Sequence, residues 1–193
     1  ESEGIYNIWR SKIYKSLDFV GFLHYDKELK LIKKDLFGRQ RTNITERIQK
    51  YLQGKTRAHI SFETHDIVKD YQQKILADIT KPNVLGGDGL NCYDYILGDY
   101  NTFFQTNYLI DDLFEKKKIN LCSCFLIDIA GFEKMMGFFN WVVLSGKLDS
   151  FDTEHENRLQ GGLAERYFGV FLAFEYDECK DLSLIHHYNC GIK

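Results

Sequence analysis

Residues 119–148 read INLCSCFLIDIAGFEKMMGFFNWVVLSGKL, and this stretch decides the fold class. Its first part, 119–129, is a mostly apolar run whose length predicts a central, buried strand. Its second part, 131–148, predicts a helix. A buried strand that is followed directly by a helix is the repeating unit of α/β folds.

The same alternation continues on both sides of this stretch. Apolar runs predict further strands at 17–25, 57–62, 93–97 and 181–188, with a more exposed strand or extended return at 27–35. Capped or amphipathic segments predict helices at 4–16, 42–54, 63–79, 101–118 and 158–176. Strands that alternate with helices predict an α/β fold with an open mixed, mostly parallel sheet and helices on both of its faces.

Length and composition narrow the class further. The chain has 193 residues, which is enough for one α/β domain with a sizeable core, so we expect residues 1–193 to form a single domain. Hydrophobic residues make up 44% of the chain, as in globular proteins. The net charge of −3 argues against nucleic acid as a main partner. The apolar runs are too short and too broken to span a bilayer.

The five cysteines form no spaced framework, and their odd number favours free thiols in a reducing compartment such as the cytoplasm. Cys122 and Cys124 alternate with Ser123 inside an apolar run, so we interpret them as two small side chains on one strand face. A metal-binding C-x-C pair would need two more soft ligands, which the sequence does not indicate.

Two apolar runs end in polar side chains. The first ends at His24 and Asp26, and the second, LSLIHHYN (182–189), ends in a polar cluster that begins with His186 and His187. If both strands run the same way, these groups converge at one sheet edge. A carboxylate with imidazoles suits Mn²⁺ or Mg²⁺, which would neutralise a diphosphate and help it leave. The alternative is that His24 and Asp26 bond to nearby backbone at a solvated strand end.

Glu165 and Arg166 interrupt the apolar segment GGLAERYFGVF, 161–171. Charges are seldom buried without a partner or a task. Glu165 could act as a general base or bind a sugar hydroxyl, and Arg166 could hold a phosphate. Equally, the two charges could belong to an internal ion pair that holds this helix on the sheet.

Three other segments carry weaker signals. The glycine cluster at 84–95 lacks the spacing of a phosphate-binding loop, so Asp88 either contacts a substrate or is solvated in a flexible turn. The segment ISFETHD, 60–66, offers Glu63, His65 and Asp66, although residues 64–66 are interpreted chiefly as helix caps. The lysine run at 116–118 predicts a solvated helix end. The G-x-S-x-G motif of serine hydrolases is absent.

Four short motifs follow one another along the chain. They are IYNIWRSKIYKSLDFVGFLHYD (5–26), CYDYILGDYNTFFQTNY (92–108), CSCFLIDIAGFEKMMGFFNWV (122–142) and GGLAERYFGVFLAF (161–174). In this order they resemble a family of bacterial capsular-polysaccharide glycosyltransferase-like proteins. Members of that family have a strand ending in His-Tyr-Arg-Arg, a Tyr-Asp-Ile/Val-Ile-Leu segment and a closing Leu-Ala-Glu-Arg helix. The resemblance spans most of residues 5–175.

The resemblance implies a GT-A- or Rossmann-like glycosyltransferase of polysaccharide biosynthesis. Such an enzyme moves a sugar from a nucleoside-diphosphate sugar to a glycan or lipid-linked acceptor, in the cytoplasm or in peripheral association with the inner face of the membrane. Glu165 would deprotonate or orient the acceptor hydroxyl, and Arg166 would balance charge nearby. The family also has a further strand–helix unit upstream of the point where this chain starts. The expectation is that the sequence is an excerpt that omits this unit, that the unit is supplied elsewhere, or that the activity is lost.

The strand end departs from the family pattern. His24 and Tyr25 match the family's His-Tyr, whereas Asp26 and Lys27 replace its two arginines. We expect all four to contact the substrate. Asp26 makes the strand end more like the Asp-x-Asp element of GT-A enzymes, here His-x-Asp, with Mn²⁺ or Mg²⁺ bound by His24, Asp26 and His187.

Two other classes of function stay open. The chain could be a non-catalytic nucleotide-sugar or glycan-binding module of a larger polysaccharide-synthesis protein, which the replaced arginines and the lacking upstream unit favour. It could also be a metal-dependent phosphoesterase or nuclease that uses the same His and Asp residues, although the charge balance argues against nucleic acid. The oligomeric state is not indicated by the sequence.

Overall fold

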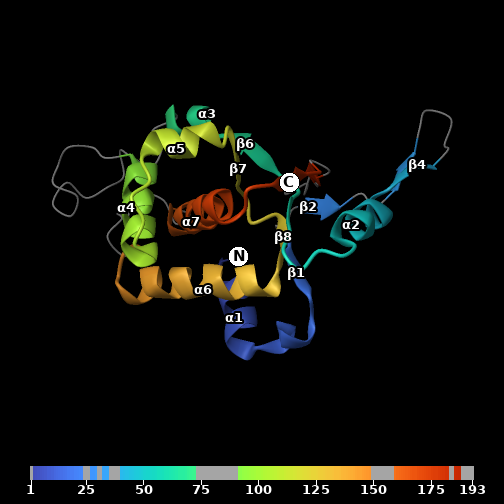
Figure 1. Cartoon of the computed structure of the whole chain (residues 1–193), viewed down its shortest axis with the longest axis horizontal. Coiled ribbons are helices and arrows are strands. Elements are labelled where there is room, and N and C mark those ends of the chain that lie inside the picture. Colours follow the sequence, from blue (N-terminus) through green and yellow to red (C-terminus); the bar gives the residue numbers. More distant parts are fainter. Residues whose placement is uncertain are drawn as a thin grey trace, which may run out of the picture.

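The computed structural model describes residues 2–23, 27–29, 32–34, 40–72, 91–148, 159–182 and 185–187 (Figure 1). The helices are α1 Ser2–Ser11, the 3₁₀ helix η1 Ile13–Ser16, α2 Ile44–Leu52, α3 Ile67–Gln72, α4 Cys92–Phe104, α5 Ile110–Glu115, α6 Ile129–Leu144 and α7 Leu159–Glu175. The strands are β1 Phe19–Phe22, β2 Lys27–Leu29, β3 Ile32–Lys34, β4 Gln40–Asn43, β5 His59–Ser61, β6 Thr64–Asp66, β7 Lys118–Asn120, β8 Phe125–Asp128, β9 Cys179–Asp181 and β10 Ile185–His187.

The main sheet has four strands in the order β1-β8-β5-β9. Strand β8 is antiparallel to both β1 and β5, while β5 and β9 are parallel. The predicted α/β class with an open mixed sheet is therefore confirmed. The predicted excess of parallel pairs is wrong for the strands described, because β5–β9 is the one parallel pair among them.

The antiparallel pairing follows from the path of the chain. The chain leaves the sheet along β5 and β6, forms helices α3 to α5, and returns along β7 and β8. A strand that leaves the sheet and a strand that returns beside it run in opposite directions. Accordingly, β6 and β7 pair antiparallel. The amide of Phe62 donates to the carbonyl of Cys124 at 2.9 Å, which links the β6–β7 ladder to the main sheet.

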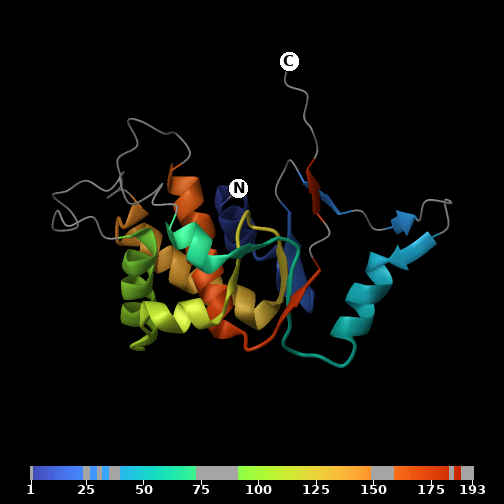
Figure 2. The ribbon, with the colours of Figure 1, turned by 90° about the horizontal axis from the view of Figure 1, so that it is seen from above.

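Helix α7 is the centre of one layer. It packs against α4, α6 and β7, and Figures 1 and 2 show it surrounded by helices on one side of the sheet. Most of its residues from 163 to 172 are buried, as expected for a helix that is apolar all round. Its backbone lies close to β7, since a Cβ on Gly169 would lie 2.5 Å from the Asn120 carbonyl oxygen.

The other face of the sheet is covered by α2. Ile60 and Phe62 form a second buried cluster with Ile44 of α2, whereas Phe125 and Ile127 point into the large cluster beneath α6 and α7. Alternate residues thus serve opposite faces. Figure 2 shows α2 on the far side of the sheet from α7, so both faces are covered, as the sequence predicts.

Several predicted elements differ from the structure. Residues 93–97 were expected as a strand but belong to α4, whose first turn is capped by Asn91 through the Tyr93 amide at 3.0 Å. The predicted helix 101–118 ends at Phe104 and resumes as α5, because Gln105 adopts a left-handed backbone. The predicted strand 119–129 is divided by a turn at 122–123, also left-handed.

The expected caps at residues 64–66 are confirmed in part. These residues form strand β6 rather than a helix start, and only then does α3 begin at Ile67. Asp66 caps α3, since its Oδ1 accepts from the Lys69 amide at 3.0 Å.

Candidate functional site

Strands β2 and β10 bring two of the predicted site segments together. They are antiparallel, with Lys27 opposite His187. The first apolar run itself forms β1, so the direction of that run relative to β10 stays a prediction. Proximity nevertheless results, because the chain enters β2 at Lys27 where β10 ends at His187. The structure describes only the backbone at these two positions.

The other predicted donors lie outside the described residues. These are His24, Tyr25, Asp26 and Asp88. Lys27, which follows Asp26 in the sequence, is the residue that pairs with His187. The metal ligands and substrate contacts of these residues stay predictions.

Arg166 is held by an ion pair between helices. Its Nε lies 3.0 Å from Asp70 Oδ2 and its Nη2 lies 3.0 Å from Asp70 Oδ1. Its Nη1 also donates to the carbonyl of Gly162 at 3.0 Å. The hydroxyl of Tyr93 donates to Asp70 at 2.6 Å. An internal ion pair is therefore present at Arg166, but it joins α7 to helix α3 and does not hold α7 on the sheet, as the sequence alternative supposed.

Glu165 precedes Arg166 on α7 and is half-buried. Figures 1 and 2 both place α7 to one side of β1 and β8, and the β2–β10 pair to the other. The convergence of Glu165 with residues 24–26 and His187 around one substrate stays a prediction.

A pocket of about 350 Å³ opens between the C-terminal end of α7 and the strands β5, β6, β7 and β9. It is lined by His59, Thr64, Lys116, Lys117, Lys118, Ile119, Asn120, Leu172, Ala173, Tyr176, Asp177, Cys179 and Asp181. This volume is within the range of ligand-binding pockets. The predicted catalytic residues Glu165 and Arg166 are not among its described lining residues.

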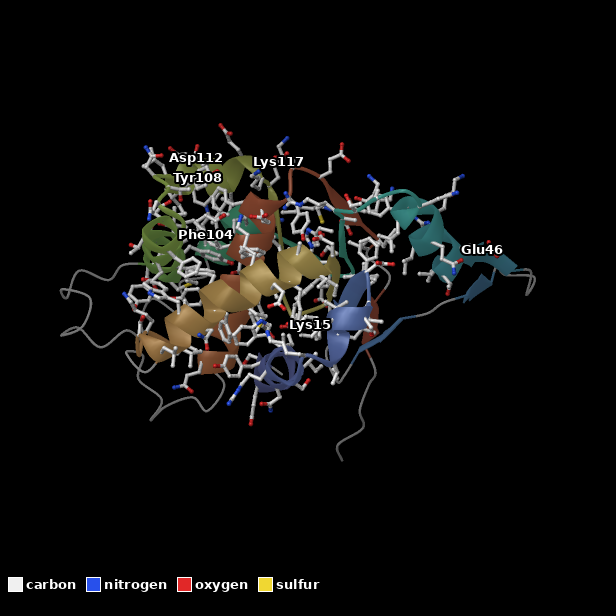
Figure 3. The ribbon with its side chains drawn as sticks, turned by 60° about the horizontal axis from the view of Figure 1, so that its bottom comes forward. Lys15, Glu46, Phe104, Tyr108, Asp112 and Lys117 are labelled. Atoms are coloured by element: carbon white, nitrogen blue, oxygen red, sulfur yellow. The ribbon has the colours of Figure 1, made fainter. Side chains whose placement is uncertain are left out.

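The charges around this pocket are of both signs. Asp181 accepts from Thr64 Oγ1 and from Lys118 Nζ, each at 2.9 Å, so this carboxylate joins β9 to β6 and β7. Lys116 and Lys117 are exposed, and Figure 3 shows Lys117 at the edge of the molecule. Their ammonium groups would favour an anionic ligand.

His59 closes the buried side of the pocket. Its side chain lies 5.4 Å from the Tyr176 ring between centroids, and only 3% of the residue is exposed. Burial lowers its pKa to about 4, so the imidazole is neutral at pH 7. Neither ring nitrogen has a hydrogen-bond partner among the residues that the structure describes.

The sequence carried little signal for this pocket. Lysines 116–118 were predicted as a solvated helix end, which holds for Lys116 at the C-terminus of α5, whereas Lys118 begins β7 and pairs with Asp181. The residues that line the pocket come from three segments that are far apart in the sequence. The pairing of β5 with β9 and of β6 with β7 brings these segments together.

Comparisons with known proteins bear on the fold. No family model matches the chain, and no curated protein matches it at a significant level. The chain is similar in structure to WbbM, a bifunctional glycosyltransferase solved in its apo form, with a TM-score of 0.54 and 15% sequence identity. The match covers 94% of this chain and 35% of that one, so this chain spans about a third of that protein. The chain therefore shares its fold with the matched part of that protein.

In the part of the chain that the structure describes, every helix is too short or too polar to cross a membrane.

Proposed function

We propose that the chain is a glycosyltransferase domain that moves a sugar from a nucleoside-diphosphate sugar to a glycan or lipid-linked acceptor. The observation that carries this proposal is the similarity of nearly the whole chain, 94%, to part of a bifunctional glycosyltransferase. The ordered motifs at 5–26, 92–108, 122–142 and 161–174 support the same activity by resemblance to a glycosyltransferase-like family.

The donor would bind where the chain passes from β1 into β2. In the proposal His24, Tyr25 and Lys27 contact the donor, and Lys27 would provide a positive charge close to its diphosphate. The pairing of Lys27 with His187 supports this arrangement, because it brings the β10 end to the same place.

Mn²⁺ or Mg²⁺ fits this location, since His24, Asp26 and His187 offer a carboxylate and two imidazoles. When bound, the ion would neutralise charge on the diphosphate leaving group. Tyr25 and Lys27 would orient the donor beside it.

Glu165 is the proposed general base, which takes the proton of the acceptor hydroxyl as the new glycosidic bond forms. Arg166 would not contact the substrate. Through its ion pair with Asp70, it would hold the helical turn of α7 that carries Glu165 in place. The pocket beside Lys116 and Lys117 supports a further role in binding a phosphorylated ligand, such as a lipid-linked acceptor.

The test uses the full chain with a panel of UDP-, GDP- and dTDP-sugars, each with and without Mn²⁺. Binding should raise the melting temperature by mass action, and this identifies the donor. The donor is then incubated with a panel of simple glycosides, and release of the nucleoside diphosphate is measured.

Release that depends on both donor and acceptor supports the proposal. A rise in melting temperature without release under any condition would instead favour the non-catalytic binding module. If no nucleotide sugar changes the melting temperature, both the transferase and the nucleotide-sugar module are wrong.

A further inference from the structure

Three side chains from two segments that are far apart in the sequence meet beside the paired strands β6 and β7. Glu63 lies between β5 and β6, His65 lies in β6, and Cys122 lies in the turn between β7 and β8. One ligand atom from each residue lies within 4.8 Å of the others. They are the one group of three such donors that meets this criterion among the described residues.

The distances resemble those of a metal centre. Glu63 Oε1 lies 3.0 Å from His65 Nε2 and 3.7 Å from Cys122 Sγ. Around a tetrahedral zinc ion with ordinary bond lengths, an oxygen and a nitrogen ligand are about 3.4 Å apart, and an oxygen and a sulfur ligand about 3.6 Å. The observed separations differ from these values by only a few tenths of an ångström, which small side-chain rotations cover.

From this geometry we propose that Glu63, His65 and Cys122 bind zinc. A thiolate with an imidazole favours Zn²⁺ over Mn²⁺ or Mg²⁺, which prefer oxygen ligands. This centre is separate from the Mn²⁺ or Mg²⁺ ligands of the proposed transferase, and it does not depend on that activity.

A buried amide holds the two ligand-bearing segments together. Asn120 Nδ2 donates to the carbonyl of Glu63 at 3.1 Å and to the carbonyl of Cys124 at 2.8 Å. Asn120 is 4% exposed, so the segments are fixed relative to each other before any ion binds. Preorganised ligands need little rearrangement on binding.

Cys122 and Cys124 differ in backbone conformation and in surroundings. Cys122 has a φ of 60° and Ser123 a φ of 47°, conformations that non-glycine residues seldom adopt. Cys124 is fully buried in the cluster beneath α2, as expected for a core side chain. The interpretation of both cysteines as neighbours on one strand face is wrong, because residues 122–123 form a turn. Cys122 instead lies half-buried in the turn, with its thiol toward Glu63.

The centre is open on one side. The side chains of His65 and Glu63 are 40% and 16% exposed. Three protein ligands with a solvent-facing fourth position are the pattern of zinc sites that bind water or a substrate atom. The same three side chains could otherwise form only a hydrogen-bonded cluster between two turns, and metal analysis distinguishes the two.

The test starts from the tag-free full chain, stripped with chelator and then given one equivalent of zinc or cobalt. We expect one bound zinc per chain by elemental analysis after desalting. Cobalt should produce a thiolate-to-metal charge-transfer band, which reports on sulfur ligation. Manganese at the same concentration should not compete.

Cys122→Ser and His65→Gln are the test variants, and Cys179→Ser is the matched control because Cys179 lies outside the cluster. Loss of a direct ligand should weaken zinc binding by at least about tenfold, the lower limit found for outer-shell partners. Circular dichroism checks that each variant is folded, and the half-buried His65 is expected to tolerate substitution best. Absence of zinc from the wild-type chain, or full zinc occupancy in both folded ligand variants, would overturn the proposal.

Discussion

Asp70 accepts two hydrogen bonds from Arg166, each at 3.0 Å, and thereby ties α3 to α7. The two side chains are 10% and 17% exposed, so the ion pair is shielded from water. The Tyr93 hydroxyl from α4 donates to the same carboxylate. Three helices that are far apart in the sequence therefore depend on one aspartate.

Asp70→Ala should destabilise the fold strongly. It leaves the Arg166 charge largely buried without its counter-ion, a change that costs about 3–5 kcal/mol in known cases. Urea denaturation should show this as a lower free energy of unfolding. The double variant Asp70→Leu with Arg166→Met should recover much of the loss, because it leaves no unpaired charge. A loss below about 1 kcal/mol in Asp70→Ala would mean that the pair is effectively solvated.

Gly169→Ala should disrupt the contact between α7 and β7. The new Cβ would lie 2.5 Å from the Asn120 carbonyl oxygen and 2.8 Å from Ile119 Cγ1, and neither the strand backbone nor a packed side chain can move far. Overpacking of this kind costs about 1–3 kcal/mol.

Gly137→Ala in α6 is the matched control, because nothing lies within 4 Å of its Cβ position. Alanine favours a helix over glycine by up to about 1 kcal/mol, so this variant should be as stable as the wild type or more stable. The two variants should thus shift the melting temperature in opposite directions. A stabilised Gly169→Ala would contradict the close approach of α7 to β7.

Local sequence patterns correctly predicted the type of those helices and strands that bury a continuous apolar surface. The predicted helix 131–148 overlaps most of α6, which runs from Ile129 to Leu144, and the apolar run at 57–62 contains β5, since each buries a continuous apolar surface. Residues 93–97 have the same apolar character but form part of α4, because a short run of this kind fits either structure. Only the partners in the core decide between them.

The candidate sites depend on contacts that no local pattern encodes. Glu63 and Cys122 are 59 residues apart, and they meet only because β5–β6 and β7–β8 pair in one register. The sequence indicated that Arg166 either binds substrate or forms an ion pair. It could not identify Asp70 as the ion-pair partner, because the two residues are 96 positions apart. The pocket beside Lys118 needs the parallel pairing of β5 with β9, which the sequence did not predict.

His59 should make the fold sensitive to acid. Its pKa falls from 6.5 in the unfolded chain to about 4 in the folded one, so between these values the unfolded chain binds more protons. This contribution to stability is complete above about pH 6.5 and is lost as the pH falls toward 4. The full loss is about 3 kcal/mol, at about 1.4 kcal/mol per pKa unit.

His59→Leu removes this titration and places an apolar side chain in the buried wall of the pocket. The free energy of unfolding of both proteins is measured by urea denaturation from pH 7.5 to pH 4.5. Carboxylates titrate alike in the two proteins, so the difference between them isolates His59. The variant should gain stability relative to the wild type as the pH falls, and parallel curves would show that His59 does not charge on unfolding in this range.

Glu165→Gln tests the proposed general base. The amide keeps the shape of the side chain but cannot accept the acceptor proton, so turnover should fall by about 10²–10⁴-fold while the melting temperature changes little. Donor binding, measured by thermal shift with the nucleotide sugar, should remain, because only the acceptor side of the reaction is affected. Glu115→Gln, an exposed glutamate at the end of α5, is the control and should retain full turnover. Near-normal turnover in a folded Glu165→Gln variant would remove Glu165 from the mechanism, and an equal loss in Glu115→Gln would trace the effect to net charge instead.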